Sequence, residues 1–288
     1  MIKLDGRALS KRILADIKQR VEAFKERYHR TPRLMIVSAN DDPASKVYIR
    51  SKTRACDDVG IYYTVGYAVE DTTLDEIRNG MEEAACRNDV DGIILQLPLA
   101  ERFRGHEREL INLIPPEKDV DGLTDVNLGR LLAGDESGFT PCTPKGIMRL
   151  LDAYSISLKG RDVTIVGRSA LVGLPLFHLM TREGASVKVC HRQTCPTSLA
   201  DALNDADVVV SAAGSPALIT PAYTSCGQVL IDVGINRTEE GLCGDISPDC
   251  YEDSYAYTPV PGGIGPMTVA MLMENTLLAA ERRAEYGY

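Results

Sequence analysis

The sequence predicts an α/β protein built from parallel sheets that helices cover on both faces. Apolar residues recur with helical spacing in several segments, and continuous apolar runs of strand length lie between those segments. Continuous apolar strands that alternate with helices are typical of parallel sheets buried on both sides. The length of 288 residues also favours two domains over a single core.

The first half of the chain supplies one set of alternating elements. Four apolar residues that share a face indicate a first helix, namely Ile13, Ile17, Val21 and Phe24. Strands are expected over residues 33–39, 61–69 and 90–99. Between them, one helix should begin at Pro43 and end before Gly60, and another should begin after a cap at Thr73.

The second half repeats the alternation after a segment rich in Asp, Gly and turn residues. That segment, residues 117–141, is the expected domain boundary. A helix should begin at Thr143 and Pro144, and a long helix should close the chain over residues 266–285. Strands are expected over residues 162–167, 185–190, 206–214 and 228–235, with helices in the first two gaps.

Composition and charge argue against several functional classes. No apolar run approaches the roughly 18 residues of a membrane span, and residues 1–18 contain no apolar stretch typical of a secretory signal. We therefore expect a cytoplasmic location and no membrane partner. The net charge of −9 argues against nucleic acid, because phosphate binding favours a basic surface. The eight cysteines show no CxxC pair and no zinc-ligand spacing, so reduced thiols and no metal are expected.

A strand, a glycine-bearing turn and a helix follow one another at residues 162–175, which suggests a dinucleotide site. The strand ends at Gly167, and Arg168, Ser169 and Gly173 follow before Pro175. A helix N-terminus offers N–H groups and a positive dipole to a pyrophosphate, and glycine lets the backbone come close. The two glycines are six residues apart and do not form G-x-G-x-x-G, so a purely structural turn stays an open alternative.

The next strand indicates which dinucleotide would bind. It ends in His191 and Arg192 without the carboxylate that usually selects NAD at this position. Arg192 and Arg168 could instead grip a 2′-phosphate with their guanidinium groups, which favours NADP. Two solvated surface arginines would be the alternative.

A helix in the first half carries candidate acid/base residues. Tyr48 and Lys52 are four residues apart and share a helix face with Ser45. A tyrosine beside a desolvated lysine can form an acid/base pair, although spacing alone favours an ordinary amphipathic helix with an exposed lysine. Short-chain dehydrogenases also carry Tyr-x-x-x-Lys, but there it follows the nucleotide-binding turn, whereas here it precedes that turn.

Three further segments have residues suited to binding a heterocycle. Gln96 ends a buried strand, where open α/β sheets bind ligands, and its amide both donates and accepts. Asp119 and Asp121 lie in the boundary segment, where Asp121 could accept hydrogen bonds from an amino-pterin-like ring. Turn formation by these aspartates is the alternative. Residues 259–268 contain three glycines and three prolines before the last helix, which suggests a loop shaped around a ligand.

Together these segments resemble the methylenetetrahydrofolate dehydrogenase/cyclohydrolase family. The matching stretches follow the family's order and are DDPASKVYIRSKTRAC, DGIILQLPL, PPEKDVDGLTDVNLGRL, TPCTPKGIM, VGRSALVGLP, DVGINR, GDI and TPVPGGIGPMTVAMLMENT. The resemblance implies two α/β domains around a cleft and a homodimer. A folate-binding domain would comprise residues 1–140 and the returning C-terminal helix, 265–288. A Rossmann-type NADP-binding domain would comprise residues 141–264.

The resemblance also implies roles for individual residues. Lys52 would be the catalytic lysine, with Tyr48, Gln96 and Asp121 beside it in the folate site. The remaining substrate-binding residues would be Ser45, Leu95, Leu97, Pro261, Gly262, Gly263, Ile264 and Gly265. The NADP-binding residues would be Gly167, Arg168, Ser169, Gly173, Arg192 and Ile235. Arg192 departs from the family, which commonly has a serine there, and the segment after Gln96 lacks a common proline.

The implied activity has two steps in one-carbon metabolism. NADP-dependent oxidation of 5,10-methylenetetrahydrofolate would give the methenyl cation, and water would then open that ring to 10-formyltetrahydrofolate. Lys52 would assist proton transfer, Gln96 would hold or tune it, and Asp121 would anchor the pterin. The alternatives are a dehydrogenase without the hydrolytic step and a catalytically silent protein that binds NADP or folate.

Overall fold

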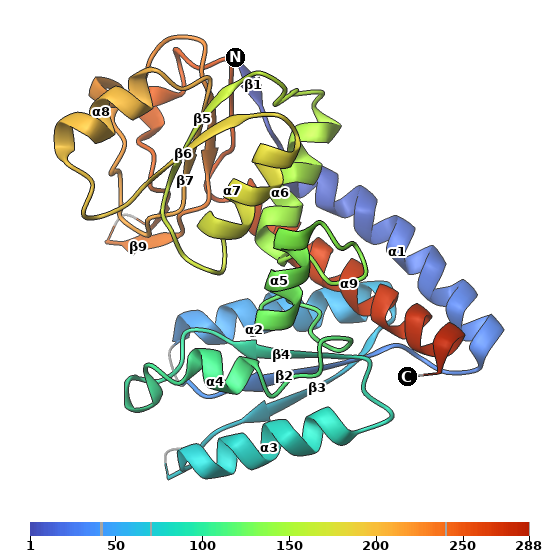
Figure 1. Ribbon diagram of the computed structural model, residues 1–288. Coiled ribbons are helices and arrows are strands. Elements are labelled where there is room, and N and C mark those ends of the chain that lie inside the picture. The colour runs from blue at the N-terminus through green and yellow to red at the C-terminus, as the bar shows by residue number, and fades with distance from the viewer. Residues whose placement is uncertain (41–42, 70, 240, 288) are drawn as a thin grey trace. The chain divides into compact units, whose positions relative to one another are not determined.

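A computed structural model describes residues 1–40, 43–69, 71–239 and 241–287 of the chain (Figure 1). The chain forms two compact units, each containing one parallel sheet. The three-stranded unit comprises Lys11–Cys142 and Val269–Tyr288, and the six-stranded unit comprises Met1–Ser10 and Thr143–Thr268. Within the described ranges, no helix has the length and apolar character that a membrane crossing requires.

The three-stranded unit has a central strand with a parallel neighbour on each side. Its strands are β2 (Arg33–Ser38), β3 (Tyr62–Tyr67) and β4 (Gly92–Gln96), in the order β3-β2-β4. Its helices are α2 (Pro43–Val59), α3 (Leu74–Cys86), α4 (Glu107–Ile111), α5 (Asp125–Ala133) and most of α1 (Gly6–Tyr28) and α9 (Ile264–Tyr286), with a 3-10 turn at Glu101–Phe103. Ile93 and Leu95 of β4 pack with Ile77 and Met81 of α3 on one face of the sheet.

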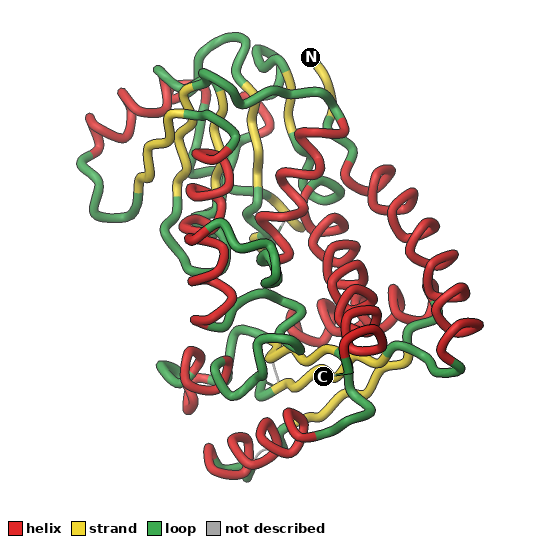
Figure 2. The backbone as a smooth tube through the Cα atoms, turned by 45° about the vertical axis from the view of Figure 1, so that its right-hand side comes forward, coloured by secondary structure: helices red, strands yellow, loops and turns green. Residues whose placement is uncertain are grey.

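The helix ends in this unit agree with the capping and turn residues predicted from the sequence. Thr73 caps α3 with a reciprocal capping box, in which its hydroxyl accepts from the Glu76 backbone N–H at 3.2 Å. Helix α2 ends at Val59, and Gly60 follows with a φ of +82°, which favours glycine. Helices α1 and α9 lie side by side (Figures 1 and 2), and Arg20 bonds to Glu281 between them at 2.9 Å. The predicted return of the C-terminal helix to the first domain is confirmed.

The six-stranded unit has the doubly wound order of a Rossmann-type fold. Its strands are β1 (Ile2–Lys3), β5 (Asp162–Val166), β6 (Ser186–Cys190), β7 (Val208–Ser211), β8 (Val229–Asp232) and β11 (Ala256–Tyr257). They pair in parallel in the order β1-β11-β8-β7-β5-β6. The chain goes from β5 to β6 on one side and then to β7 on the other. The switch point of the sheet therefore lies between β5 and β7.

Helices and a hairpin complete this unit. The helices are α6 (Cys142–Ala153, from Thr143 onward in this unit), α7 (Gly173–Arg182) and α8 (Pro196–Asn204), with 3-10 turns at Pro221–Tyr223 and Pro248–Cys250. The antiparallel hairpin consists of β9 (Asn236–Thr238) and β10 (Gly241–Cys243). Helices α7 and α8 fill the two gaps where helices were predicted.

Two features differ from the sequence-based expectation. Residues 1–10 group with the six-stranded unit, because the Ile2 and Leu4 backbone N–H groups donate to β11 and its flank at 2.8 Å each. A strand of two residues leaves no periodic signal in the sequence. The boundary segment also contains a helix, α5, which Thr124 caps and Gly134 terminates with a φ of +74°.

Candidate active site and nucleotide site

Helix α2 presents three of the predicted residues on one face. Ser45 is buried, Lys52 is half-buried, and the Tyr48 side chain is 39% exposed. The spacing of three and four residues sets their side chains one above another along the helix. Lys52 is therefore not the exposed lysine of an ordinary amphipathic helix.

Lys52 reaches the end of β4, where it meets Gln96. The Lys52 Nζ donates to Gln96 Oε1 at 2.9 Å, and Gln96 Nε2 donates to the Leu97 carbonyl at 2.6 Å. Gln96 is only 5% exposed, so both ends of its amide are fixed by partners within the protein. A neutral acceptor thus holds the lysine nitrogen at the carboxyl edge of the sheet, where α/β proteins bind ligands.

The two sequence neighbours of Gln96, Leu95 in β4 and Leu97 just after it, have other environments. Leu95 is 3% exposed and belongs to the core cluster that includes α3. Successive side chains of a strand point to opposite faces, so Leu95 points away from the face of Gln96. Leu97 is partly buried against the same cluster. The Leu97 carbonyl, in addition, is the acceptor that orients the Gln96 amide.

The two aspartates predicted as binding residues, Asp119 and Asp121, are in different environments. Asp119 is 1% exposed and accepts hydrogen bonds from Gly122, Leu123, Thr124 and Asn127 at 2.7–3.1 Å. Burial raises the pKa of Asp119, and the hydrogen bonds to its neighbours oppose that shift. Turn formation therefore accounts for Asp119. Asp121 is half-buried and stays available as the predicted pterin anchor.

In the six-stranded unit, β5 leads into α7 through a turn that requires glycine at two positions. Gly167 has a φ of +131°, and a Cβ there would lie 2.4 Å from the Ala212 carbonyl oxygen. A Cβ on Gly173, the first residue of α7, would lie 2.1 Å from the Gly167 oxygen. The close backbone packing at the switch point and the adjacent helix N-terminus suit a dinucleotide pyrophosphate.

The remaining predicted NADP residues surround this turn. The Ser169 hydroxyl accepts from the Val172 N–H at 3.2 Å, which shapes the turn before α7. Arg168 is exposed, and its Nη2 donates to Gln193 Oε1 at 3.2 Å. Gln193 follows Arg192, which is also exposed at the end of β6. Both arginines therefore belong to loops at the carboxyl ends of two adjacent strands, where an adenine ribose would lie.

The glycine- and proline-rich segment before α9 is tightly packed. Helix α9 begins at Ile264, so Ile264 and Gly265 are helical and the loop is shorter than the sequence suggested. A Cβ on Gly263 would lie 2.7 Å from the Pro259 oxygen, and one on Gly265 would lie 3.5 Å from Cδ1 of Ile235. Pro261 is exposed, and Gly262 has a φ of +114°.

Two buried carboxylates close to the turn between β5 and α7 have no role that the sequence predicts. Asp232 and Asp245 are 1% and 0% exposed, and both accept several backbone hydrogen bonds. The sequence signal was present, because these residues belong to the DVGINR and GDI stretches, which contributed only to the family resemblance.

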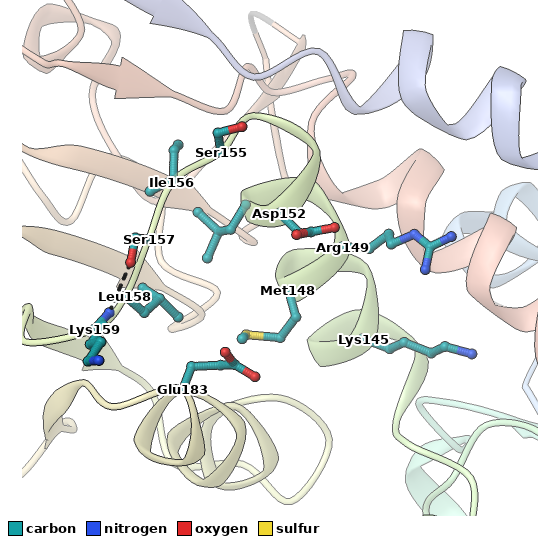
Figure 3. Close-up of a pocket in the computed structure, with 11 residues that line it drawn as sticks. Lys145, Met148, Arg149, Asp152, Ser155, Ile156, Ser157, Leu158, Lys159 and Glu183 are labelled. Atoms are coloured by element: carbon teal, nitrogen blue, oxygen red, sulfur yellow. Dashed lines mark hydrogen bonds between the residues drawn. The ribbon is translucent and has the colours of Figure 1, made fainter.

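A pocket of about 700 Å³ in the six-stranded unit lies apart from these residues (Figure 3). It is lined by ten of the residues between Lys145 and Lys159, which belong to α6 and the following segment, and by Glu183 after α7. These segments precede β5 or follow the C-terminus of α7, which places the pocket toward the amino end of the sheet. The predicted NADP residues lie at the carboxyl end.

Comparison with known proteins identifies the family. Residues 4–121 match the model described as the tetrahydrofolate dehydrogenase/cyclohydrolase catalytic domain. Residues 141–284 match the NAD(P)-binding domain of the same family. The second match includes most of α9, whereas the sequence predicts that this helix belongs to the folate-binding domain.

Individual relatives match over nearly the whole chain. The bifunctional protein FolD 2 of Frankia alni is 45% identical, covering 99% of this chain and 97% of the relative. The FolD dehydrogenase/cyclohydrolase structure from Campylobacter jejuni is 39% identical with a TM-score of 0.93, covering 98% and 99% of the two chains. The Trypanosoma brucei enzyme, solved with NADP and an inhibitor, is 31% identical with a TM-score of 0.91, covering 98% of each. The chain therefore belongs to the tetrahydrofolate dehydrogenase/cyclohydrolase family.

Proposed function

We propose that this chain is a bifunctional folate enzyme. It oxidises 5,10-methylenetetrahydrofolate to the methenyl compound with NADP, and it hydrolyses that product to 10-formyltetrahydrofolate. Membership of the family and the match of both its domains support this proposal. The single structural observation that carries the hydrolytic half is the 2.9 Å hydrogen bond from Lys52 to Gln96.

Lys52 moves the proton in the hydrolytic step. Water adds to the methenyl carbon, loses a proton, and the five-membered ring opens as a ring nitrogen leaves and is protonated. A lysine nitrogen held at the sheet edge can accept and return that proton. The Gln96 amide is a neutral acceptor, so it orients the nitrogen without adding a fixed charge beside it.

The six-stranded unit holds NADP at the switch point of its sheet. NADP, when bound, accepts the hydride from the methylene carbon of the substrate. Gly167 and Gly173 allow the backbone to come close to the pyrophosphate, and Ser169 shapes the turn that presents the α7 N-terminus. Arg168 and Arg192 contact the 2′-phosphate, and Ile235 contacts the cofactor from the loop after β8.

Other residues orient the reduced folate. Asp121 accepts hydrogen bonds from the pterin, and Tyr48 lies on the same helix face as Lys52. The remaining contacts come from Ser45 and Leu97, and from Pro261, Gly262, Gly263, Ile264 and Gly265, whereas the Leu95 side chain packs into the core behind them. The chain acts in the cytoplasm as a homodimer.

Separate assays of the two steps test this function. Lys52→Met should lower methenyl hydrolysis without NADP by about 10²–10⁴-fold, the usual contribution of a positioned acid/base group. Lys46→Met removes an exposed lysine from the same helix and should leave hydrolysis unchanged. Full hydrolysis by Lys52→Met would contradict the role of Lys52.

The wild-type chain separates the alternatives. Turnover of methylenetetrahydrofolate with NADP but no methenyl hydrolysis would indicate a dehydrogenase alone. Binding of NADP or folate without either turnover would indicate a catalytically silent protein.

A further inference from the structure

The Asp245 carboxylate lies close to the turn between β5 and α7, residues 167–173, which is called the nucleotide turn below. It accepts hydrogen bonds from three segments. Its Oδ2 accepts from the Ala213 and Gly214 N–H groups at 2.7 and 3.0 Å, and from Ser211 Oγ at 3.1 Å. Its Oδ1 accepts from the Ser215 N–H and from Asn236 Nδ2, both at 2.9 Å. The carboxylate thus binds one end of β7, the loop after it, and the first residue of β9.

Three consecutive N–H groups that converge on one anion form a backbone nest, the arrangement that other proteins use for phosphate. Here the protein's own carboxylate occupies it, so residues 213–215 do not offer these donors to a ligand. The pyrophosphate must therefore take its donors from the N-terminus of α7, on the β5 side of the switch point. The loop after β7 would line the other side of the nucleotide site, and the Asp245 carboxylate determines the conformation of this loop.

The loop after β7 is in direct contact with the nucleotide turn. The Ala212 N–H donates to the Val166 carbonyl at 2.8 Å, and the Ala212 oxygen occupies the space where a Gly167 side chain would begin. A shift of residues 212–215 would therefore displace Gly167 or open a gap beside it. On the other side, Asn236 follows Ile235, so the same carboxylate also restrains the loop after β8.

Asp232 in turn fixes Asp245. Its Oδ1 accepts from the Asp245 N–H at 3.0 Å and from the Gly234 N–H at 2.9 Å, and its Oδ2 accepts from the Ile246 N–H at 2.8 Å. Asp232 is the last residue of β8, so the position of Asp245 is tied to the sheet itself.

We propose that Asp245 is a positioning residue of the nucleotide site, whose carboxylate holds the loops after β7 and β8 against the Gly167 turn. This inference rests on the proposed NADP-dependent oxidation. It assigns Asp245 to cofactor binding and not to the proton transfer at Lys52, which lies in the three-stranded unit.

Asp245→Asn provides the test, because an amide of the same shape replaces one acceptor oxygen with a donor nitrogen. The Kd and KM for NADP should rise at least about tenfold, which corresponds to about 1.4 kcal/mol. The kcat at saturating NADP should change less than about threefold, because bound NADP selects the ordered loops. Methenyl hydrolysis without NADP should stay at the wild-type rate.

Asp249→Asn is the matched control, because it removes an exposed carboxylate of the same unit that accepts from Ser247 and not from the nucleotide loops. It should leave NADP affinity unchanged. A folded Asp245→Asn protein with wild-type NADP affinity would overturn the proposal, as would equal losses of NADP-dependent oxidation and NADP-free hydrolysis.

Ser211→Ala keeps the proposal testable if Asp245→Asn does not fold. Ser211 is 0% exposed, so it cannot touch the nucleotide, and its hydroxyl donates to Asp245 Oδ2. Loss of this hydrogen bond should raise the KM for NADP about two- to tenfold, and an unchanged KM would overturn the proposal. A wild-type chain that neither binds NADP nor turns over folate would instead overturn the proposed function, and this inference with it.

Discussion

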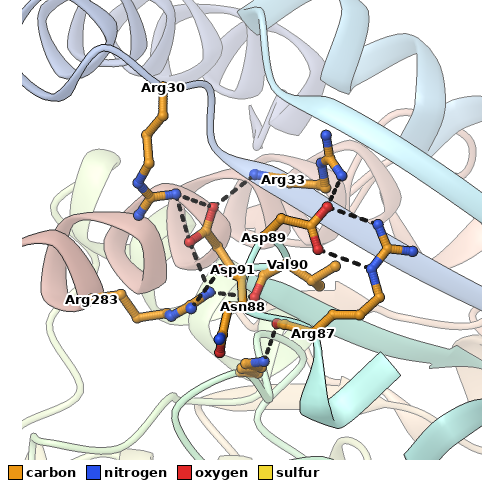
Figure 4. A network of polar contacts seen from close by, with 9 residues as sticks. Arg30, Arg33, Arg87, Asn88, Asp89, Val90, Asp91 and Arg283 are labelled. Carbon is orange, nitrogen blue, oxygen red and sulfur yellow. Dashed lines mark hydrogen bonds and ion pairs between the residues drawn. The ribbon is translucent and has the colours of Figure 1, made fainter. Parts of the chain in front are cut away.

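Replacing Asp91 with asparagine should destabilise the three-stranded unit much more than the same replacement at Asp89, two residues away. Asp91 is 0% exposed and accepts from Arg30 Nη1 at 2.8 and 2.9 Å, from Arg283 Nη1 at 3.2 Å, and from the Arg33 backbone N–H at 2.9 Å (Figure 4). These contacts join the residue before β4 to the start of β2, to the chain that precedes β2, and to α9. The Arg283 side chain is itself only 8% exposed.

The magnitude follows from the burial of this group. Breaking a buried ion pair by removing one partner usually costs about 3–5 kcal/mol, because the remaining charges lose their compensation. Asparagine keeps one acceptor oxygen, so the expected loss is about 3 kcal/mol. In a unit of this size, that loss should lower the Tm by roughly 6–12 °C.

Asp89 provides the comparison. The hydrogen bond from Arg87 lowers its pKa to about 2, with a further contribution from Arg33, but its side chain is 50% exposed. Solvent screening limits such a surface pair to at most about 1 kcal/mol. Asp89→Asn should therefore change the Tm by no more than about 4 °C.

Thermal and urea unfolding of the full chain, followed by circular dichroism and by methenyl hydrolysis, would measure both losses. Hydrolysis reports on the unit that contains Lys52. Equal shifts for the two variants would refute the argument that burial determines the worth of these carboxylates.

Three further predictions concern the six-stranded unit. Gly167→Ala should weaken NADP binding at least about tenfold, because its Cβ would lie 2.4 Å from the Ala212 oxygen. Methenyl hydrolysis without NADP should continue. Isothermal titration with NADP measures the affinity, and an unchanged Kd would contradict this prediction. The wild type should prefer NADP over NAD at least roughly tenfold in kcat/KM, and Arg192→Ser should lower that ratio without changing the value for NAD. Burial raises the pKa of Asp232 to about 6. The folded state therefore binds the carboxyl proton of Asp232 more tightly than the unfolded chain does. Its contribution to the free energy of unfolding is fully present below about pH 4 and is lost as the pH rises through about 6. Asp232→Asn should remove roughly 3 kcal/mol of that pH dependence, and parallel stability–pH curves for the two proteins would contradict it.

Much of the candidate site could be predicted from the sequence because its parts are local. The helical spacing of Tyr48 and Lys52 places both on one face of α2, and the turn at Gly167 follows directly from its strand. The partner of Lys52 could not be derived from spacing. Gln96 is 44 residues away and meets Lys52 only because β4 pairs with β2 and α2 packs nearby.

The sequence by itself determined the α/β class, the alternating elements and their caps, because periodicity, capping and turn preferences act between residues at most a few positions apart. It also carried the family resemblance through its motifs. Only the tertiary structure decided that Ile2 and Lys3 pair with β11, that Asp119 forms a turn, and that Asp245 joins several loops. Those outcomes depend on which distant backbone groups become neighbours when the sheets assemble, and no local pattern encodes that choice.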